Sequence, residues 1–235
     1  MNRKLILRAL IIFAVGGAVL GAAFAGLYLT REQNAQFARM SPADETFAEP
    51  GAVPIGGPFT LVDHTGRAVT EKDFGGRYLL VFFGFSNCAD VCPTTLADIA
   101  TTLDLLGTDS NAVQPMFVSL DPERDTPERL AEYVMAFHPK IVGLTGTPEQ
   151  IAAVAKEYRA FYEKVSAASY YGNETGKAEG KSGPGDDYLI SHQGNTYLMS
   201  PSSEYLTHFA YGTKPEEMAA TIREAVAKFG NWVPE

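Results

Sequence analysis

Residues 78–96 read YLLVFFGFSNCADVCPTTL, and they predict a buried strand, a polar turn and the first turns of a helix. The apolar run from Tyr78 to Phe85 is typical of a central strand that is covered on both faces. Leucine and isoleucine recur at helical spacing from Pro93 to Leu106. A strand that ends in a polar turn and continues as a helix is a common place for a site in an α/β protein. Here the turn carries Cys88 and Cys92, the only two cysteines of the chain.

The rest of the chain from Phe59 onward alternates between strand and helix patterns. A short strand and a turn open this part, and later strands are expected at 114–120, 141–144, 187–191, 196–200 and 205–211. Helix starts are marked by proline and glutamate after a threonine or a lysine, and the expected helices are 126–137, 147–162 and 214–229. Gln193-Gly194-Asn195 indicates a hairpin turn between the strands expected at 187–191 and 196–200. The order predicts an α/β three-layer fold with a mixed central sheet, which matches a thioredoxin-like domain at 59–235.

The first 30 residues are expected to lie outside this domain. Three basic residues precede a nearly uncharged apolar run from Ala9 to Leu29, which is long enough to cross a bilayer as a helix. The basic flank favours a cytoplasmic N-terminus, so we expect a transmembrane anchor at 1–30 and a domain on the far side, where disulfides can form. Ala23-Phe24-Ala25 leaves a cleaved signal peptide as the alternative. Residues 31–58, which carry four prolines, are expected to be a linker.

The overall composition narrows the range of partners. The 235 residues are 46% hydrophobic and 20% charged, which is a globular profile. The net charge of -9 gives no electrostatic basis for nucleic-acid binding, which needs a basic patch. We therefore expect no nucleic-acid partner.

The two cysteines carry the chemistry of the opening stretch. Cys88 and Cys92 are four residues apart, and on a helical turn such residues share a face. Two thiols placed in this way can close a redox disulfide or bind one metal ion. A helix N-terminus favours the thiolate, which both kinds of chemistry need. A purely structural disulfide is the alternative, although a bridge across so short a loop constrains the unfolded chain little.

A metal site built on two sulfurs needs a further ligand, and His192 is the candidate among the four histidines. It ends a predicted strand at the hairpin turn, and in a thioredoxin-like sheet that hairpin lies close to the loop before the first main helix. We interpret His64 as a surface turn residue and His138 as a helix-end residue that interacts with the terminal carbonyls. His208 is interpreted as a structural residue of a late strand.

The donor set of two sulfurs and one imidazole suits copper and zinc. Structural zinc sites are normally closed by four ligands, and no fourth Cys or His stands out in the sequence. The set therefore favours Cu(I), and Cu(II) with one more weak ligand. Asp90 or a water molecule is the candidate for that extra ligand, and the sequence does not choose between them.

Three segments carry a family resemblance. They are FGFSNCADVCP at 83–93, VSLDPERDTP at 118–127 and SHQGNTYLM at 191–199. They resemble the Sco/SenC family of membrane-tethered, thioredoxin-like copper proteins that serve cytochrome c oxidase assembly. The resemblance implies that copper is bound by Cys88, Cys92 and His192. It also implies that Asp121 lies near the site and influences a partner-facing surface, whereas the residues alone leave Asp121 equally well a plain turn residue.

The chain departs from the family pattern in three places. Ala89 stands between the cysteines where the family often has proline, so the loop is expected to be less rigid. Ser191 precedes the histidine where aspartate is frequent, which weakens the case for a carboxylate that orients the imidazole. The stretch from Gly172 to Asp187 is interpreted as a surface insertion. It is longer than expected and could let His192 swing away from an empty site.

Together these residues predict a copper chaperone, not an enzyme, in the bacterial inner membrane with its domain in the periplasm. It would deliver copper by ligand exchange to a copper-site subunit of cytochrome c oxidase, and would also meet a periplasmic copper donor and a thiol reductant. The main alternative is a thiol–disulfide oxidoreductase, although such enzymes usually space their cysteines by two residues and need no His192. A peroxiredoxin-like peroxidase is disfavoured because Phe85 and Ala89 stand where a hydroxyl residue would precede Cys88 and Cys92.

Overall fold

The computed structural model describes residues 47–166 and 188–230, which belong to one compact unit. Its central strand is β3 (Tyr78–Gly84), and all seven residues of this strand are buried. It pairs in parallel with β4 (Val113–Ser119) and antiparallel with β8 (Thr196–Met199). A strand that is bonded along both edges and covered on both faces must be apolar throughout, which explains the uninterrupted apolar run in the sequence.

Seven strands form the main sheet in the order β2-β1-β5-β4-β3-β8-β9. Strands β3, β4 and β5 (Val142–Thr145) run parallel, while β1 pairs antiparallel with β5, and β9 pairs antiparallel with β8. The remaining strands are β1 (Thr60–Asp63), β2 (Ala68–Thr70) and β9 (Tyr205–Phe209). The predicted mixed central sheet is confirmed.

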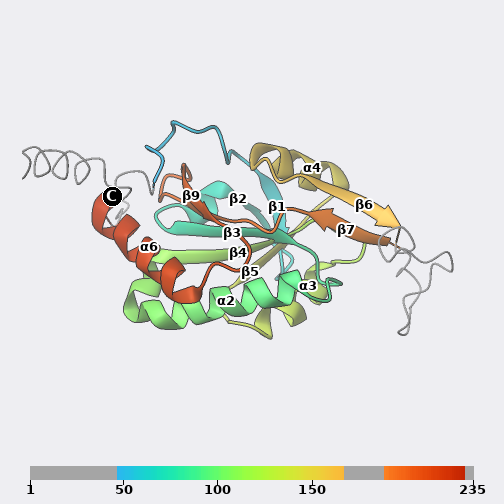
Figure 1. The fold of residues 1–235 in the computed structure, drawn as a ribbon. Helices are drawn as coiled ribbons and strands as arrows, with labels where there is room; N and C mark the ends of the chain where they lie inside the picture. Colours follow the sequence, from blue (N-terminus) through green and yellow to red (C-terminus); the bar gives the residue numbers. More distant parts are fainter. Residues whose placement is uncertain (1–46, 167–187, 231–235) are drawn as a thin grey trace, which may run out of the picture. The chain divides into compact units, whose positions relative to one another are not determined.

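Helices cover both faces of this sheet and give the predicted three layers (Figure 1). On one side lie α2 (Val91–Leu106), α3 (Pro127–Met135) and α6 (Pro215–Phe229), and on the other lies α4 (Pro148–Glu157). Two short 3-10 helices, η2 (Glu71–Phe74) and η3 (Gly107–Ala112), precede β3 and β4. Helices α3 and α4 begin where the sequence predicts, since Thr126 and Thr147 each cap a helix that has proline in its first turn.

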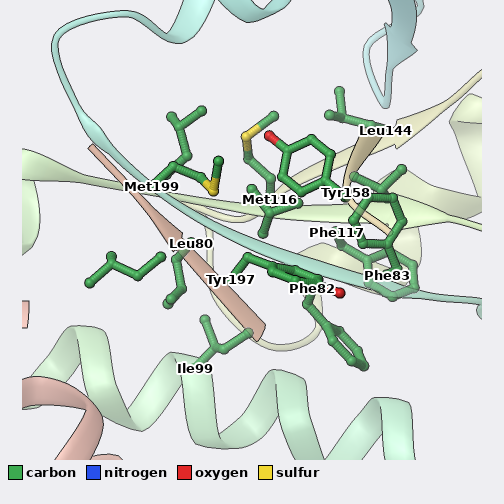
Figure 2. Packing of buried hydrophobic residues seen from close by; sticks show 14 of the residues in the cluster. Leu80, Phe82, Phe83, Ile99, Met116, Phe117, Leu144, Tyr158, Tyr197 and Met199 are labelled. Atoms are coloured by element: carbon green, nitrogen blue, oxygen red, sulfur yellow. The ribbon is translucent and has the colours of Figure 1, made fainter. Parts of the chain in front are cut away.

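The core divides at β3 because successive side chains of a strand point to opposite faces. Phe82 contacts Phe117 on the face that α2 and α3 cover, and Phe83 contacts Tyr158 on the face that α4 covers. Figure 2 shows Ile99, from α2, and Tyr158 on opposite sides of the strands. Packing on both faces therefore fixes β3 up to its last residue, where the cysteine turn begins.

The predicted hairpin between residues 187–191 and 196–200 is wrong. Strand β7 (Tyr188–His192) pairs with β6 (Tyr162–Ser166) in a separate two-stranded sheet, here called the β6–β7 ribbon. Strand β8 enters the main sheet between β3 and β9, and all four of its residues are buried. The turn signal at Gln193-Gly194-Asn195 marks a change of sheet, because β8 buries its apolar residues fully beside β3 while β7 stays on the periphery.

The helix expected at 147–162 is shorter than predicted. Helix α4 ends at Glu157, and Arg159 follows with a φ of 52°, a left-handed conformation that cannot continue a right-handed helix. The chain then extends as β6, which the sequence analysis missed. The partner of β6 is β7, far along the chain, so no local pattern marked this pairing.

The described unit begins earlier than the expected domain boundary at residue 59. Phe47 is buried, and its ring meets that of Phe229 edge-on at 5.7 Å between centroids. The backbone N–H of Ala48 donates to the carbonyl of Leu206 at 2.7 Å. Residues from 47 onward, which were assigned to the linker, therefore make contacts with the domain.

The expected anchor at 1–30 and the expected insertion at 172–187 lie outside the described residues. Within 47–166 and 188–230, no helix combines the length and apolar character needed to cross a bilayer.

Replacing Phe47 tests whether its segment belongs to the fold. Phe47→Ala is expected to lower the free energy of unfolding by about 3 kcal/mol, because it leaves a ring-sized gap in the core. Phe161→Ala is the matched control, since that ring is 72% exposed and its loss should cost less than about 0.5 kcal/mol. Urea denaturation followed by circular dichroism measures both, and equal effects would contradict the assignment.

Candidate metal centre

The cysteine turn lies between the end of β3 and the start of α2. The backbone N–H of Cys88 donates to the carbonyl of Phe85 at 3.3 Å, and the backbone N–H of Cys92 donates to the Cys88 sulfur at 3.5 Å. Cys92 is fully buried in the first turn of α2, whereas Cys88 is half-buried, and both are free thiols. The pair therefore presents one accessible sulfur and one sheltered sulfur.

Gly84 makes room for the sheltered sulfur. A Cβ at this position would lie 2.8 Å from the Sγ of Cys92 and 2.8 Å from the ring of Phe117. Real Cβ contacts are not this short, so either the sulfur or the ring would have to move. Glycine at the last position of β3 therefore sets how closely α2 and Cys92 approach the sheet.

His192 reaches the same point from the β6–β7 ribbon. Its Nε2 lies 3.7 Å from the Sγ of Cys92, and its Nδ1 lies 2.9 Å from the carbonyl oxygen of Gln193. A carbonyl can only accept a hydrogen bond, so in the neutral imidazole this contact assigns the ring proton to Nδ1 and leaves the lone pair on Nε2, facing the sulfur. The rings of Phe82 and Phe85 lie 6.2 and 5.9 Å from the imidazole between centroids. The structure thus brings Cys88, Cys92 and His192 together.

The two thiols have opposite acidities. The pKa of Cys88 is lowered to about 5, first by a hydrogen bond from the Cys92 thiol and then by the backbone N–H groups of Cys92 and Asp90. The pKa of Cys92 is raised by the same hydrogen bond, by burial and by the charge on Cys88. The favoured state of the reduced pair is one thiolate on Cys88 and one thiol on Cys92.

A buried carboxylate, Asp125, supports the cysteine turn, and the sequence analysis gave it no role. It is fully buried, and it accepts hydrogen bonds from the backbone N–H and hydroxyl of Ser86 at 3.0 and 2.5 Å. The hydroxyl of Ser119, the last residue of β4, donates to it at 2.5 Å, and the Nε of Arg129 lies 3.7 Å away. Its sequence signal was the second aspartate of the DPERDT segment. A carboxylate at this place ties together the two strand ends that border the site.

The side chains of the other residues considered from the sequence make no hydrogen bond to the two sulfurs, although the backbone N–H of Asp90 bonds to Cys88. Asp90 is an exposed N-cap of α2 whose side chain makes no capping hydrogen bond. The carboxylate of Asp121 is fully buried and binds Tyr188 and Arg124. The remaining histidines serve structural contacts: His64 accepts from the N–H of Gly143, His138 accepts from the N–H of Lys140, and His208 bonds to the hydroxyl of Tyr205.

No closed cage of ligands is preformed at this site. In the part of the chain that the structure describes, no three His, Cys, Asp or Glu side chains already converge on one metal position. The donor set still fits a soft metal ion, because it offers one thiolate, a neighbouring thiol and an imidazole lone pair directed at that thiol.

The family model described as SCO1/SenC matches residues 47–227. The chain belongs to the SCO1/SenC family. The human mitochondrial protein SCO1 homolog is 36% identical over 214 residues, covering 90% of this chain and 64% of that protein. The Arabidopsis thaliana mitochondrial SCO1 homolog 1 is 39% identical over 160 residues, covering 68% of this chain and 43% of that protein. The chain thus spans between about two fifths and two thirds of the length of these relatives.

Solved structures of the family share the fold. Bradyrhizobium japonicum ScoI with copper bound is 38% identical, with a TM-score of 0.61 over 72% of this chain and 98% of that one. Arabidopsis thaliana ScoI with copper bound is 35% identical, with a TM-score of 0.63 over 74% of this chain and 99% of that one. The thioredoxin-like fold expected from the sequence is therefore confirmed.

Enlarging Gly84 should disturb the sheltered sulfur. Gly84→Ala is expected to destabilise the reduced protein by about 1 to 3 kcal/mol, since the methyl group overpacks Cys92 and Phe117. Gly75→Ala is the control, because a Cβ there meets nothing closer than 3.4 Å. Chemical denaturation and the rate of Cys92 alkylation measure the effect. Unchanged values for Gly84→Ala would mean that the close approach is not a constraint.

The thiol acidities predict a pH dependence. Between about pH 5 and the ordinary thiol value of 9.0, Cys88 is ionised in the folded state and protonated in the unfolded state. The unfolded state then binds more protons, so the stability of the reduced protein should rise with pH across this window.

Cys88→Ser should remove that rise, and it should also remove the thiolate absorbance that wild type shows at neutral pH. Cys92→Ser should keep a titrating thiolate. Ultraviolet titration combined with denaturation at several pH values measures both effects. If the more acidic thiol of the pair titrates near the ordinary thiol pKa, the assignment is contradicted.

Proposed function

We propose that this SCO1/SenC protein is a copper chaperone that holds copper through Cys88, Cys92 and His192. The observation that carries the proposal is the approach of the His192 Nε2 to the Cys92 sulfur at 3.7 Å, with Cys88 on the same turn. The copper-bound solved relatives, at 34–38% identity, support copper as the cargo. Two sulfurs and one imidazole are ligands that Cu(I) accepts well, while zinc in structural sites is normally closed by a fourth.

The proposed chaperone releases its cargo by ligand exchange. Cys88 is half-buried and carries the thiolate, so it is the sulfur that an incoming donor protein or acceptor protein can approach. Cys92 is sheltered behind it, and His192 enters from a ribbon outside the main sheet. With three protein ligands the copper keeps an open position, at which a cysteine or histidine of the acceptor can bind before the chaperone's ligands leave. Asp90 or a water molecule is the proposed weak extra ligand for Cu(II).

We further propose the cellular setting that the sequence predicts. The chain would be anchored in the bacterial inner membrane by residues 1–30, with its domain in the periplasm. Its acceptor would be the copper-site subunit of cytochrome c oxidase, and it would also meet a periplasmic copper donor and a thiol reductant. The reductant is needed because a Cys88–Cys92 disulfide cannot bind the metal until it is reduced.

Copper titration of ligand variants tests the assignment. His192→Ala is expected to weaken copper binding by at least about a hundredfold, because even the loss of an outer residue that orients a ligand costs ten- to a hundredfold. Cys88→Ser and Cys92→Ser should abolish tight binding. His208→Ala is the control, since that exposed histidine bonds to the hydroxyl of Tyr205 on the outer strand β9. Wild-type affinity and an unchanged copper spectrum in His192→Ala would refute the site.

The asymmetric thiol pair favours a second candidate, a thiol–disulfide oxidoreductase. The Cys88 thiolate would attack a partner disulfide and release one partner thiolate, and Cys92 would then displace the second. The partner gains two electrons and becomes a dithiol, while Cys88 and Cys92 become a disulfide. Reduction of insulin with copper removed separates the candidates, because turnover that is equal in wild type and His192→Ala would favour the oxidoreductase.

A further inference from the structure

The β6–β7 ribbon carries His192 but lies outside the main sheet. Of its ten residues only Ile190 is buried, so core packing holds the ribbon weakly. Figure 1 shows the ribbon, in gold and orange, beside α4 and beyond the central strands. Apart from the rings of Phe82 and Phe85 beside His192, contacts outside the core must help to hold His192 over the cysteines.

A set of polar contacts at the far end of β7 does this. The hydroxyl of Tyr188 donates to the Oδ1 of Asp121 at 2.6 Å, and the Nε of Arg124 binds the Oδ2. The Nη1 of Arg124 donates to the carbonyl of Tyr188 at 3.2 Å, and its guanidinium lies 3.8 Å above the Tyr188 ring. We call Asp121, Arg124 and Tyr188 the clasp. Its carboxylate is fully buried, and hydrogen bonds to buried charged groups are the strong ones.

A second contact reinforces the clasp from the neighbouring strand. The Nζ of Lys164, on β6, lies 2.8 Å from a carboxylate oxygen of Glu123 and 4.6 Å from the centre of the Tyr188 ring. Both groups are exposed, so this ion pair adds little by itself. It places both strands of the ribbon against the same loop, residues 121–124.

The clasp is also joined to the cysteine turn. The hydroxyl of Ser119 accepts from the backbone N–H of Asp121 at 3.0 Å and donates to Asp125. Asp125 in turn holds Ser86, two residues before Cys88. One hydrogen-bonded chain therefore runs from the cysteine turn, through the end of β4, to the strand that carries the histidine.

We infer that the clasp of Asp121, Arg124 and Tyr188 positions His192 against the Cys88–Cys92 pair and so sets how long the cargo stays bound. The part that concerns copper rests on the proposed function, whereas the positioning of His192 does not. Tyr188 is four residues before His192, about 13 Å along a strand. A ribbon released at Tyr188 would keep its internal pairing with β6 but would lose its alignment with the sulfurs. Asp121 is thus a positioning residue and not a ligand.

The test is Tyr188→Phe in the full-length protein, which deletes one hydroxyl and keeps the ring under Arg124. Tyr205→Phe makes the same change on the outer strand β9, where the hydroxyl bonds to His208. In the metal-free, reduced protein we expect amide exchange at 188–192 to rise about tenfold in Tyr188→Phe, the equivalent of one lost hydrogen bond to a charged group. The imidazole NMR signals of His192 should shift as well. Tyr205→Phe should change neither.

Copper release completes the experiment. It should be several-fold faster from Tyr188→Phe than from wild type, with global thermal stability close to wild type in both. Unchanged exchange, or faster exchange with unmoved His192 signals, would overturn the inference. If both metal-free measurements change but copper release does not, the clasp stands and His192 is not a copper ligand. The folded Asp121→Asn variant should show the same changes in amide exchange, His192 signals and copper release as Tyr188→Phe.

Discussion

The site depends on one buried carboxylate that bridges two strand ends. Asp125 has no exposure, and burying a charge without partners would cost several kcal/mol. Its partners are Ser86, two residues past the end of β3, and Ser119, the last residue of β4. Arg129 lies nearby. Because these parallel strands end side by side, the same carboxylate can serve both, and the turn that follows β3 is then fixed relative to α3. The geometry of the cysteines follows from this constraint and from the lack of a side chain at Gly84.

Once the turn is fixed, the difference between the two sulfurs follows from where each one lies. Cys92 enters the first turn of α2 and packs against Gly84 and Phe117, so its hydrogen bond to Cys88 and its burial keep it protonated. Cys88 stays at the surface and receives hydrogen bonds from the thiol and the N–H of Cys92, so it carries the charge. The same asymmetry serves a disulfide exchange and a metal site. His192 is what a metal site adds to this pair, because thiol exchange can proceed through the two sulfurs, whereas a nitrogen lone pair 3.7 Å from the buried sulfur would supply a third metal ligand.

Local sequence predicted those parts of the fold that local physics decides. The apolar run of β3, the threonine caps with proline of α3 and α4, and the pairing of Cys88 with Cys92 in one turn could all be read from neighbouring residues. The placement of β7 and β8 in two different sheets could not be read in this way. Both segments look like strands, and only the available edge of β3 decides which of them enters the core. The partner of β6, the part played by Asp125 and the contacts of Asp121 are long-range as well. The proximity of His192 to the cysteines was expected from the fold. The expectation relied on a hairpin between 187–191 and 196–200, which the structure does not contain.

The division between the main sheet and the β6–β7 ribbon gives the proposed chaperone a route for release. Two of its proposed ligands lie where the fully buried strand β3 meets α2. The third lies on a ribbon with one buried residue. Local opening costs least where few apolar contacts are lost, so His192 can leave the cargo without disturbing the core. Removal of the nitrogen ligand would leave two sulfurs on the turn, the sheltered Cys92 and the half-buried Cys88, of which Cys88 is the one an acceptor can reach. Under the proposed function, the strength of the clasp therefore sets the balance between holding copper and handing it on.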